Sequence, residues 1–153
     1  MELHDARQIA LNLMSKHGLT GWAFDFDNAK RRFGACHFRT KRITLSIYLV
    51  ALNEAAKVTD VILHEIAHAL VGYKHGHNAV WKAKAIEIGC NGMRCYSSEN
   101  TVTPESRYIG TCPNGHTHKR HKRPTKVSSC AKCCPVYNSN YTITYILNPK
   151  FGK

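Results

Sequence analysis

The stretch that decides the fold is residues 59–71, TDVILHEIAHALV. Apolar side chains occupy most of its positions and Gly72 follows directly, so we expect a helix that begins near Thr59 or Asp60 and ends near Val71. A helix that is apolar on nearly all sides is buried in the core of its domain. The ionisable residues that interrupt the second half of this stretch are His64, Glu65 and His68.

These residues form the pattern HExxH. Residues four apart on a helix share one face, so both imidazoles can reach one metal ion while Glu65 lies beside the water bound to it. Two histidines and a glutamate in an apolar helix are costly to bury unless they have a joint task. The pattern predicts a catalytic zinc ion bound by His64 and His68, with Glu65 as general base and then general acid.

A catalytic zinc ion needs a third protein ligand, and the residues alone leave three candidates open. His75 lies in the loop after the helix, and His77 lies where that loop meets a second helix predicted over residues 78–88. Glu87 lies on the second helix, at a spacing typical of proteases that use glutamate as the third ligand. Tyr73 and His75 are the two guesses for the group that supports the oxyanion.

The residues upstream predict a helix followed by a small sheet. Residues 6–17 carry apolar side chains at helical spacing. Short or alternating apolar runs then predict strands at residues 24–27, 33–38 and 43–49. The expected fold class is therefore α+β, with a small antiparallel sheet packed on helices that carry the HExxH zinc site.

The C-terminal part has a different composition and predicts a zinc ribbon. Two short segments, CPNGH at residues 112–116 and CAKC at residues 130–133, each supply a pair of metal-binding side chains. His118 is an alternative to His116, and Cys134 is an alternative to Cys133. A closed site with four protein ligands has no open position, so this zinc ion would be structural. The predicted ligands are Cys112, His116, Cys130 and Cys133.

We therefore predict a metalloprotease domain at residues 1–92, a linker at residues 93–110 and a zinc-ribbon module at residues 111–153. Clustered cysteines indicate metal sites rather than disulfides in the reducing cytosol, which is the expected compartment because no signal peptide or membrane span is apparent. Of the other cysteines, Cys36 is expected in the core, and Cys90 and Cys95 are expected to be packing residues.

The net charge favours a polyanionic partner. The chain has 22 Lys and Arg against 10 Asp and Glu, a formal charge of +12. A charge run is usually only a solvated face, but the run between the two halves of the ribbon is anchored at both ends by a metal site and can lie along phosphates. The residues predicted to contact DNA without sequence preference are Lys119, Arg120, Lys122, Arg123 and Lys126.

Two segments carry a resemblance to a known family. LHEIAHAL at residues 63–70, followed by GHNAVW at residues 76–81, resembles the SprT-like (Spartan-type) zinc metalloproteases, which have HExxH and then a histidine followed four residues later by Trp or Phe. His77 and Trp81 match that pair, so the resemblance selects His77 as the third zinc ligand. Trp81 would hold His77 in place as a packed neighbour. RFGAC at residues 32–36 and ITLS at residues 43–46 look like the family's paired strands.

The resemblance covers about residues 5–92, and bacterial-type members also carry a C-terminal zinc ribbon. The gap between His68 and His77 is shorter than in animal members, and no long interaction tail is present, so regulation by partners is not carried over. The resemblance implies a zinc metalloendopeptidase with one catalytic and one structural zinc ion. Its substrates would be proteins bound or crosslinked to DNA. The protein is expected in the cytoplasm, and at the nucleoid if its source is prokaryotic or viral.

Two other functions compete with this expectation. One is a nucleic-acid-binding zinc-ribbon protein whose protease centre is vestigial, and the other is a general zinc peptidase whose basic charge is incidental. The complete set of His64, Glu65, His68 and His77 argues against a vestigial centre, because a metal site alone does not need Glu65. No membrane partner is expected, and the sequence does not predict an oligomeric state.

Overall fold

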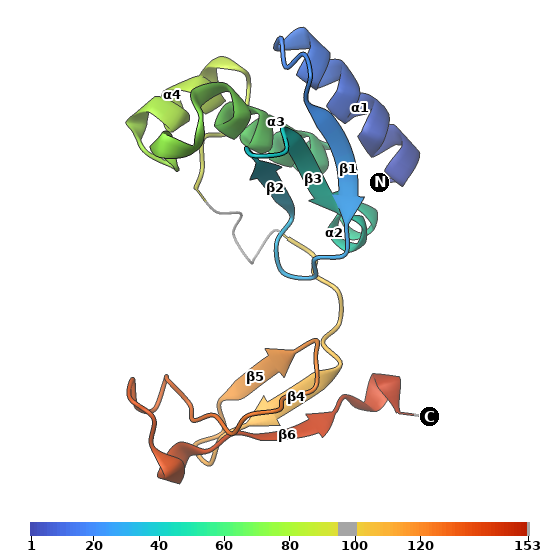
Figure 1. Ribbon diagram of the computed structural model, residues 1–153. Helices are drawn as coiled ribbons and strands as arrows, with labels where there is room; N and C mark the ends of the chain where they lie inside the picture. The colour runs from blue at the N-terminus through green and yellow to red at the C-terminus, as the bar shows by residue number, and fades with distance from the viewer. Residues whose placement is uncertain (95–100, 153) are drawn as a thin grey trace. The chain divides into compact units, whose positions relative to one another are not determined.

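The computed structural model describes residues 1–94 and 101–152, and the chain divides into two compact units, Met1–Pro104 and Glu105–Lys153 (Figure 1). The division falls inside the predicted linker. The second unit already includes strand β4 (Tyr108–Thr111), so its first strand begins before the predicted boundary at residue 111. Cys95 lies outside the described residues.

The first unit confirms the α+β class. Helices α1 and α3 pack against each other and against a three-stranded sheet (Figure 1). Its elements, in chain order, are α1 (Leu3–Lys16), β1 (Ala23–Asp27), β2 (Gly34–His37), β3 (Arg42–Ser46), α2 (Ile47–Leu52), α3 (Ala55–Val71), a 3-10 turn (Tyr73–His75) and α4 (Ala79–Glu87).

The sheet is mixed, so the prediction of a wholly antiparallel sheet was wrong. Its strand order is β1-β3-β2. Strand β2 forms an antiparallel hairpin with β3, whereas β1 runs parallel to β3 with Phe24 opposite Ile43. Alternating apolar residues identify a strand but not its neighbours. Here β3, the most buried strand, lies between β1 and β2, and β2 is left at an edge.

Two predicted boundaries also differ from the structure. The strand expected to reach Leu49 ends at Ser46, whose Oγ accepts a hydrogen bond from the Leu49 amide and caps α2. Helix α3 begins at Ala55 instead of near Thr59, because the preceding residues are good helix formers and Val58 is fully buried in the core. Asp60 is therefore not a cap, and its carboxylate accepts hydrogen bonds from the backbone and side chain of Asn91.

The core of the first unit joins α1, the sheet and α3. Fully buried side chains from all three meet there: Ala6, Ala10, Ile43, Leu45, Val61, Ile62 and Ile66. A second cluster joins α3 to α4 through Leu63, Ala67, Trp81 and Ala85. Because both faces of α3 are packed, its position in the unit is fixed on two sides.

The second unit is an antiparallel sheet of order β5-β4-β6. Strand β5 spans Thr117–Arg120 and β6 spans Thr144–Leu147. Gly110 on β4 lies opposite Tyr145 on β6, and an added Cβ at Gly110 would lie 2.5 Å from the Tyr145 ring. The small core of this unit contains Cys112, Cys130 and Ile143. No helix among the described residues is long and apolar enough to span a lipid bilayer.

Candidate metal centres and catalytic pocket

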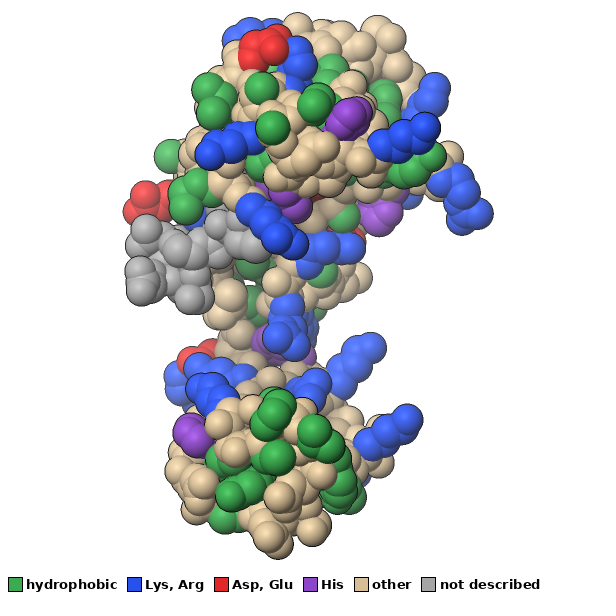
Figure 2. All heavy atoms as spheres, turned by 90° about the vertical axis from the view of Figure 1, so that its left-hand side faces the viewer, with side chains coloured by type: hydrophobic (Ala, Val, Ile, Leu, Met, Phe, Trp, Pro, Cys, Tyr) green, Lys and Arg blue, Asp and Glu red, His purple; other side chains and the backbone are tan. Residues whose placement is uncertain are grey.

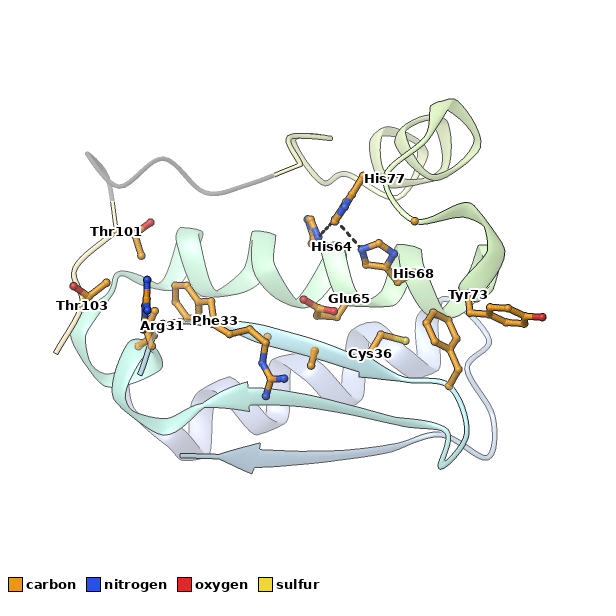
Figure 3. Close-up of a pocket in the computed structure, with 16 residues that line it drawn as sticks. Arg31, Phe33, Cys36, His64, Glu65, His68, Tyr73, His77, Thr101 and Thr103 are labelled. Carbon is orange, nitrogen blue, oxygen red and sulfur yellow. Dashed lines mark hydrogen bonds between the residues drawn. The ribbon is translucent and has the colours of Figure 1, made fainter. Parts of the chain in front are cut away.

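Three histidines of the first unit bring their ring nitrogens together. His64 and His68 lie one turn apart on α3, and His77 lies in the loop before α4 (Figure 3). The Nε2 atom of His77 is 3.0 Å from the Nε2 atoms of both His64 and His68. One nitrogen from each ring lies within 4.8 Å of the others. The geometry therefore brings together the three residues predicted to bind the catalytic metal.

The short loop between α3 and α4 places His77. Gly72 ends α3 with φ of 86°, a conformation that a side chain would disfavour. Asn78 then caps α4, its Oδ1 accepting hydrogen bonds from the amides of Val80 and Trp81. His77 immediately precedes that cap, so the start of α4 fixes its backbone.

The other two candidates for the third ligand lie outside the cluster. Glu87 is exposed, and both of its carboxylate oxygens accept hydrogen bonds from Lys84 Nζ, at 2.7 and 2.6 Å. The Nδ1 atom of His75 lies 3.4 Å from the side-chain nitrogen of Asn78. Of His75, His77 and Glu87, only His77 has its donor atom beside those of α3.

The donor set fits a zinc ion. Burial, followed by the charges of neighbouring histidines, lowers the pKa of His64 to about 3 and that of His68 to about 4. Burial also lowers the pKa of His77. The rings are thus neutral near pH 7, which is the form that binds metal. Tetrahedral zinc with Zn–N bonds of about 2.0–2.1 Å separates its nitrogen ligands by roughly 3.3 Å, close to the arrangement here.

Trp81 packs against all three rings. Its ring centroid is 4.6 Å from that of His64, 5.1 Å from that of His68 and 4.6 Å from that of His77. Only 1% of its surface is exposed. The predicted contact between Trp81 and His77 is therefore present, and the same indole also restrains both histidines of α3.

Glu65 lies at a cavity of about 660 Å³ that the three histidines also line (Figure 3). It carries the one carboxylate among the described residues of the lining. Burial raises the pKa of Glu65 to about 8, and the charge of Arg32 opposes this rise. A buried carboxylate in one cavity with three converging imidazole nitrogens is an arrangement suited to proton transfer in metal-assisted hydrolysis.

Gly34 on β2 is a site residue that the sequence analysis did not single out. An added Cβ there would lie 2.8 Å from Oε1 and 2.9 Å from Cγ of Glu65, and 3.0 Å from Leu45 Cδ2. The backbone of β2 thus passes directly against the carboxylate. The available signal was an isolated glycine inside a strand pattern, which often marks a close backbone approach.

Comparison with known proteins agrees with this geometry. The profile of the SprT-like family matches residues 6–105. The chain belongs to the SprT-like family. This membership places it in a metallopeptidase-type family. No curated protein and no solved structure matches the chain.

Two cysteines of the SprT-like unit have different surroundings. Cys36 lines the cavity and is half-buried, so it is not the core residue that was expected. Burial raises its pKa to about 12, which keeps the thiol protonated. Cys90 is buried between α3 and α4, where its Sγ lies 3.7 Å from the Asp60 carbonyl oxygen, consistent with packing.

The ribbon following the SprT-like unit contains a second cluster. The donor atoms of Cys112, His116, Cys130 and Cys133 lie within 4.8 Å of one another. The Cys112 and Cys133 sulfurs are 3.8 Å apart, which matches the separation of about 3.8 Å that tetrahedral Zn–S bonds of about 2.3 Å impose. His118 Nε2 lies 3.3 Å from Cys130 Sγ but belongs to no such group of four among the described residues. The donors fit a closed zinc site.

All five residues predicted to contact DNA are exposed on the ribbon unit. Arg123 and Lys126 line a hollow of about 630 Å³ together with Arg107, Tyr108 and Tyr145. Arg120 Nε donates a hydrogen bond to the Tyr145 hydroxyl at 3.3 Å. Figure 2 shows Lys and Arg side chains on this unit beside a group of hydrophobic side chains. The structure therefore brings basic and aromatic groups together here.

Proposed function

We propose that the protein is a zinc-dependent endopeptidase that cleaves proteins bound or crosslinked to DNA. The observation that carries this proposal is the convergence of His64, His68 and His77 beside the buried carboxylate of Glu65. Membership of a metallopeptidase-type family supports it. Under this proposal, His64, His68 and His77 bind the catalytic zinc, whereas Cys112, His116, Cys130 and Cys133 bind a structural zinc.

A zinc ion at the histidine site would polarise a substrate carbonyl and make a water molecule more acidic. Glu65 accepts the proton of the attacking water and returns it to the leaving amine. Burial raises the pKa of Glu65, and the charge of a zinc ion at the neighbouring histidines would oppose this rise, so that the group could both accept a proton and return it near neutral pH. Gly34 leaves the space in which the Glu65 side chain lies.

The substrate would bind as an extended peptide along β2. This strand is at the edge of the sheet, and Gly34, Ala35 and Cys36 line the cavity that also contains Glu65. An edge strand presents backbone donors and acceptors to which another extended chain can pair. Backbone pairing of this kind gives binding that depends little on substrate sequence, as an enzyme acting on many proteins requires.

The ribbon would hold the enzyme on DNA. Lys119, Arg120, Lys122, Arg123 and Lys126 are exposed, and phosphate contacts from such residues give affinity without base reading. The aromatic rings of Tyr108 and Tyr145, which line the same hollow as Arg123, offer faces for unpaired bases. Enzyme and substrate on one DNA molecule meet at a high effective concentration, which would direct cleavage to DNA-bound proteins.

One experiment tests the whole proposal. Zinc is quantified per chain, and wild type is compared with Glu65→Gln for cleavage of a DNA-binding protein, with and without DNA. We expect about two zinc ions in both proteins, cleavage stimulated by DNA in wild type, and a loss of roughly 100-fold or more in Glu65→Gln. Glu87→Gln is the matched control, because Glu87 is exposed and paired with Lys84.

The competing functions predict other outcomes. Cleavage that survived Glu65→Gln would mean that the chemistry is misassigned. DNA binding without any cleavage by wild type would favour a vestigial centre. A free protein cut as fast as a DNA-bound one would indicate a general peptidase, and the dependence of DNA affinity on salt would show whether the basic residues contact phosphates at all.

A further inference from the structure

One end of the cavity is formed by a segment that is distant from α3 in sequence. Thr101 and Thr103 both line the cavity, whereas the side chain of Val102 between them is exposed. Figure 3 places the two threonines beside Arg31 and Phe33, at the end of the cavity opposite Tyr73. Four side chains from two separate segments thus gather at one end of the cavity.

Asn53 links residues 101–103 to the rest of the first unit through hydrogen bonds. Its Nδ2 donates to the Val102 carbonyl at 2.8 Å, and its Oδ1 accepts from the Val102 amide at 2.9 Å. The same Nδ2 donates to the carbonyl of Leu49, which lines the cavity, at 2.8 Å. Asn53 is buried, with 7% of its surface exposed. Its amide therefore has both donors and its acceptor engaged, which fixes its orientation and that of the segment it holds.

Arg31 supplies the charge at this end of the cavity. It is exposed, and no carboxylate among residues 1–94 and 101–152 pairs with it. Its neighbour Arg32, by contrast, donates to Asp27. A guanidinium group with no acidic partner among the described residues, in a cavity that two threonines also line, is suited to bind a carboxylate through its forked donors.

We propose that this end of the cavity is a subsite for an acidic side chain of the polypeptide substrate, built by Arg31, Thr101 and Thr103 and positioned by Asn53. The proposal rests on the peptidase function proposed above. A polypeptide is favoured over a nucleic acid because the same cavity contains Glu65 and the edge strand β2. Asn53 is a positioning residue, since it acts through Val102 rather than on the substrate.

Paired peptides test the charge of the subsite. Each pair differs only by Glu or Lys at one position, and the position is scanned on both sides of the cleaved bond. We expect wild type to prefer Glu at one position by roughly fivefold in kcat/KM, as a partly exposed ion pair allows. Arg31→Ala should remove the preference and Arg31→Glu should reverse it. Arg39→Glu makes the same charge change at an exposed residue outside the cavity lining and should leave the preference intact.

A preference for Glu that persisted in Arg31→Glu would overturn the proposal. So would a loss of affinity for a single-stranded oligonucleotide in Arg31→Ala with no change in peptide preference, because Arg31 would then be a phosphate contact. Zinc content and thermal unfolding of each variant identify proteins that have failed to fold.

Two variants test the positioning by Asn53. Asn53→Ala removes the whole side-chain amide. Val102→Pro removes the backbone donor of an exposed residue and fixes its φ, but keeps the carbonyl that accepts from Asn53. In Asn53→Ala we expect the slow exchange of the Val102 amide to be lost. In both variants we expect KM for the Glu peptide to rise several-fold, with kcat and zinc content unchanged. Asn91→Ala is the control, because Asn91 also makes two side-chain hydrogen bonds, to Asp60 and Met93, away from the cavity lining. An unchanged KM in both variants, with the Val102 amide of Asn53→Ala exchanging freely, would overturn the positioning role.

Failure of the peptidase proposal can be told apart from failure of this one. If wild type cleaves no peptide, the proposed function is contradicted, and the subsite is tested by binding of fluorescent peptides to Glu65→Gln protein. Tighter binding of the Glu peptide than of the Lys peptide, lost on adding Arg31→Ala, would support the subsite. Equal binding of the two peptides would overturn it.

Discussion

Each unit of this chain brings together side chains that could hold a metal ion, but the two clusters differ in the number of donors and in their access to a cavity. In Met1–Pro104, three imidazoles line a cavity of about 660 Å³ beside a buried carboxylate. In Glu105–Lys153, four donors from two short segments surround one point, and Asn114 Nδ2 lies 3.5 Å from Cys133 Sγ. A site with three protein donors and an adjoining cavity leaves room for a substrate, whereas four donors fill a tetrahedral coordination sphere. The number of donors and the access to them separate the two proposed roles.

The largest expected effect is the unfolding of the ribbon unit alone. Cys130→Ser removes a fully buried donor from a unit whose core is small. Because structural zinc in small domains contributes about 10–16 kcal/mol of apparent binding free energy, we expect the ribbon to unfold and one zinc ion per chain to be lost. NMR spectra and zinc analysis measure this, and Cys134→Ser, which changes a cysteine outside the cluster, is the control. Loss of structure in Met1–Pro104 as well would show that the units do not fold independently.

The second-largest expected effect is the loss of metal binding at the histidine site alone. His77→Ala removes one of three donors, so we expect loss of the other zinc ion and of protease activity by roughly 1,000-fold or more, with the ribbon spectrum unchanged. His75→Ala, two residues away and outside the cluster, should retain both zinc and activity. Equal losses in the two variants would contradict the assignment of the third ligand.

A third change sharpens the comparison by separating metal binding from proton transfer. Gly34→Ala pushes a methyl group against the Glu65 side chain, and none of the three atoms nearest to that methyl group belongs to a histidine. We expect kcat to fall by roughly 10- to 100-fold while zinc content stays the same, since small displacements of a reacting group have effects of that size. Gly152→Ala is the control, because its added Cβ meets only the Pro149 carbonyl oxygen at 3.7 Å. Zinc loss in Gly34→Ala would mean that the two functions are not separable.

The smallest effect concerns the acid stability of the SprT-like unit. Burial alone would raise the pKa of Asp27, but hydrogen bonds from the Ala29 amide and the Thr44 hydroxyl, and then the charge of Arg32, lower it below 3.8. The ionised form therefore stabilises the fold above pH 3.8, and this contribution is lost as the pH falls through the lower, folded-state pKa.

We expect Asp27→Asn to lose about 1 kcal/mol near pH 7 and less near pH 3, measured by urea unfolding. Asp25→Asn is the control, since Asp25 is half-exposed and its ion pairs with Arg7 and Arg42 are 3.6 Å long. A stability difference that did not depend on pH would show that Asp27 acts through its shape and not its charge.

The candidate metal ligands could be grouped from the sequence because most of them are close together in it. His64 and His68 lie one turn apart, and each half of the ribbon site lies within a few residues, so spacing alone constrains the geometry. His77 was selected only through the resemblance, because a loop of several residues can place any of three candidates near the helix. The structure agrees on where His77 lies, whereas its role as a ligand stays a prediction.

The features that could not be predicted depend on contacts distant in sequence. The parallel pairing of β1 with β3 depends on which strand takes the central position, and alternation does not encode that choice. The hydrogen bonds between Asn53 and Val102 join residues 49 positions apart. The contact of Gly34 with Glu65 likewise exists only once β2 lies against α3. Local patterns identified the elements and the donors, whereas the walls of the cavity came from tertiary packing.

The contact of Trp81 with all three histidine rings links the packing of α4 against α3 to the binding of a metal ion. Trp81 holds α4 against α3, and α4 in turn delivers the third ring. A cation that requires all three nitrogens binds only when α4 is docked, so by thermodynamic linkage its binding free energy also stabilises the docking. Removal of the cation should therefore loosen α4 before any other helix of the unit. The packing of α4 against α3 would then report whether the histidine site holds a metal ion.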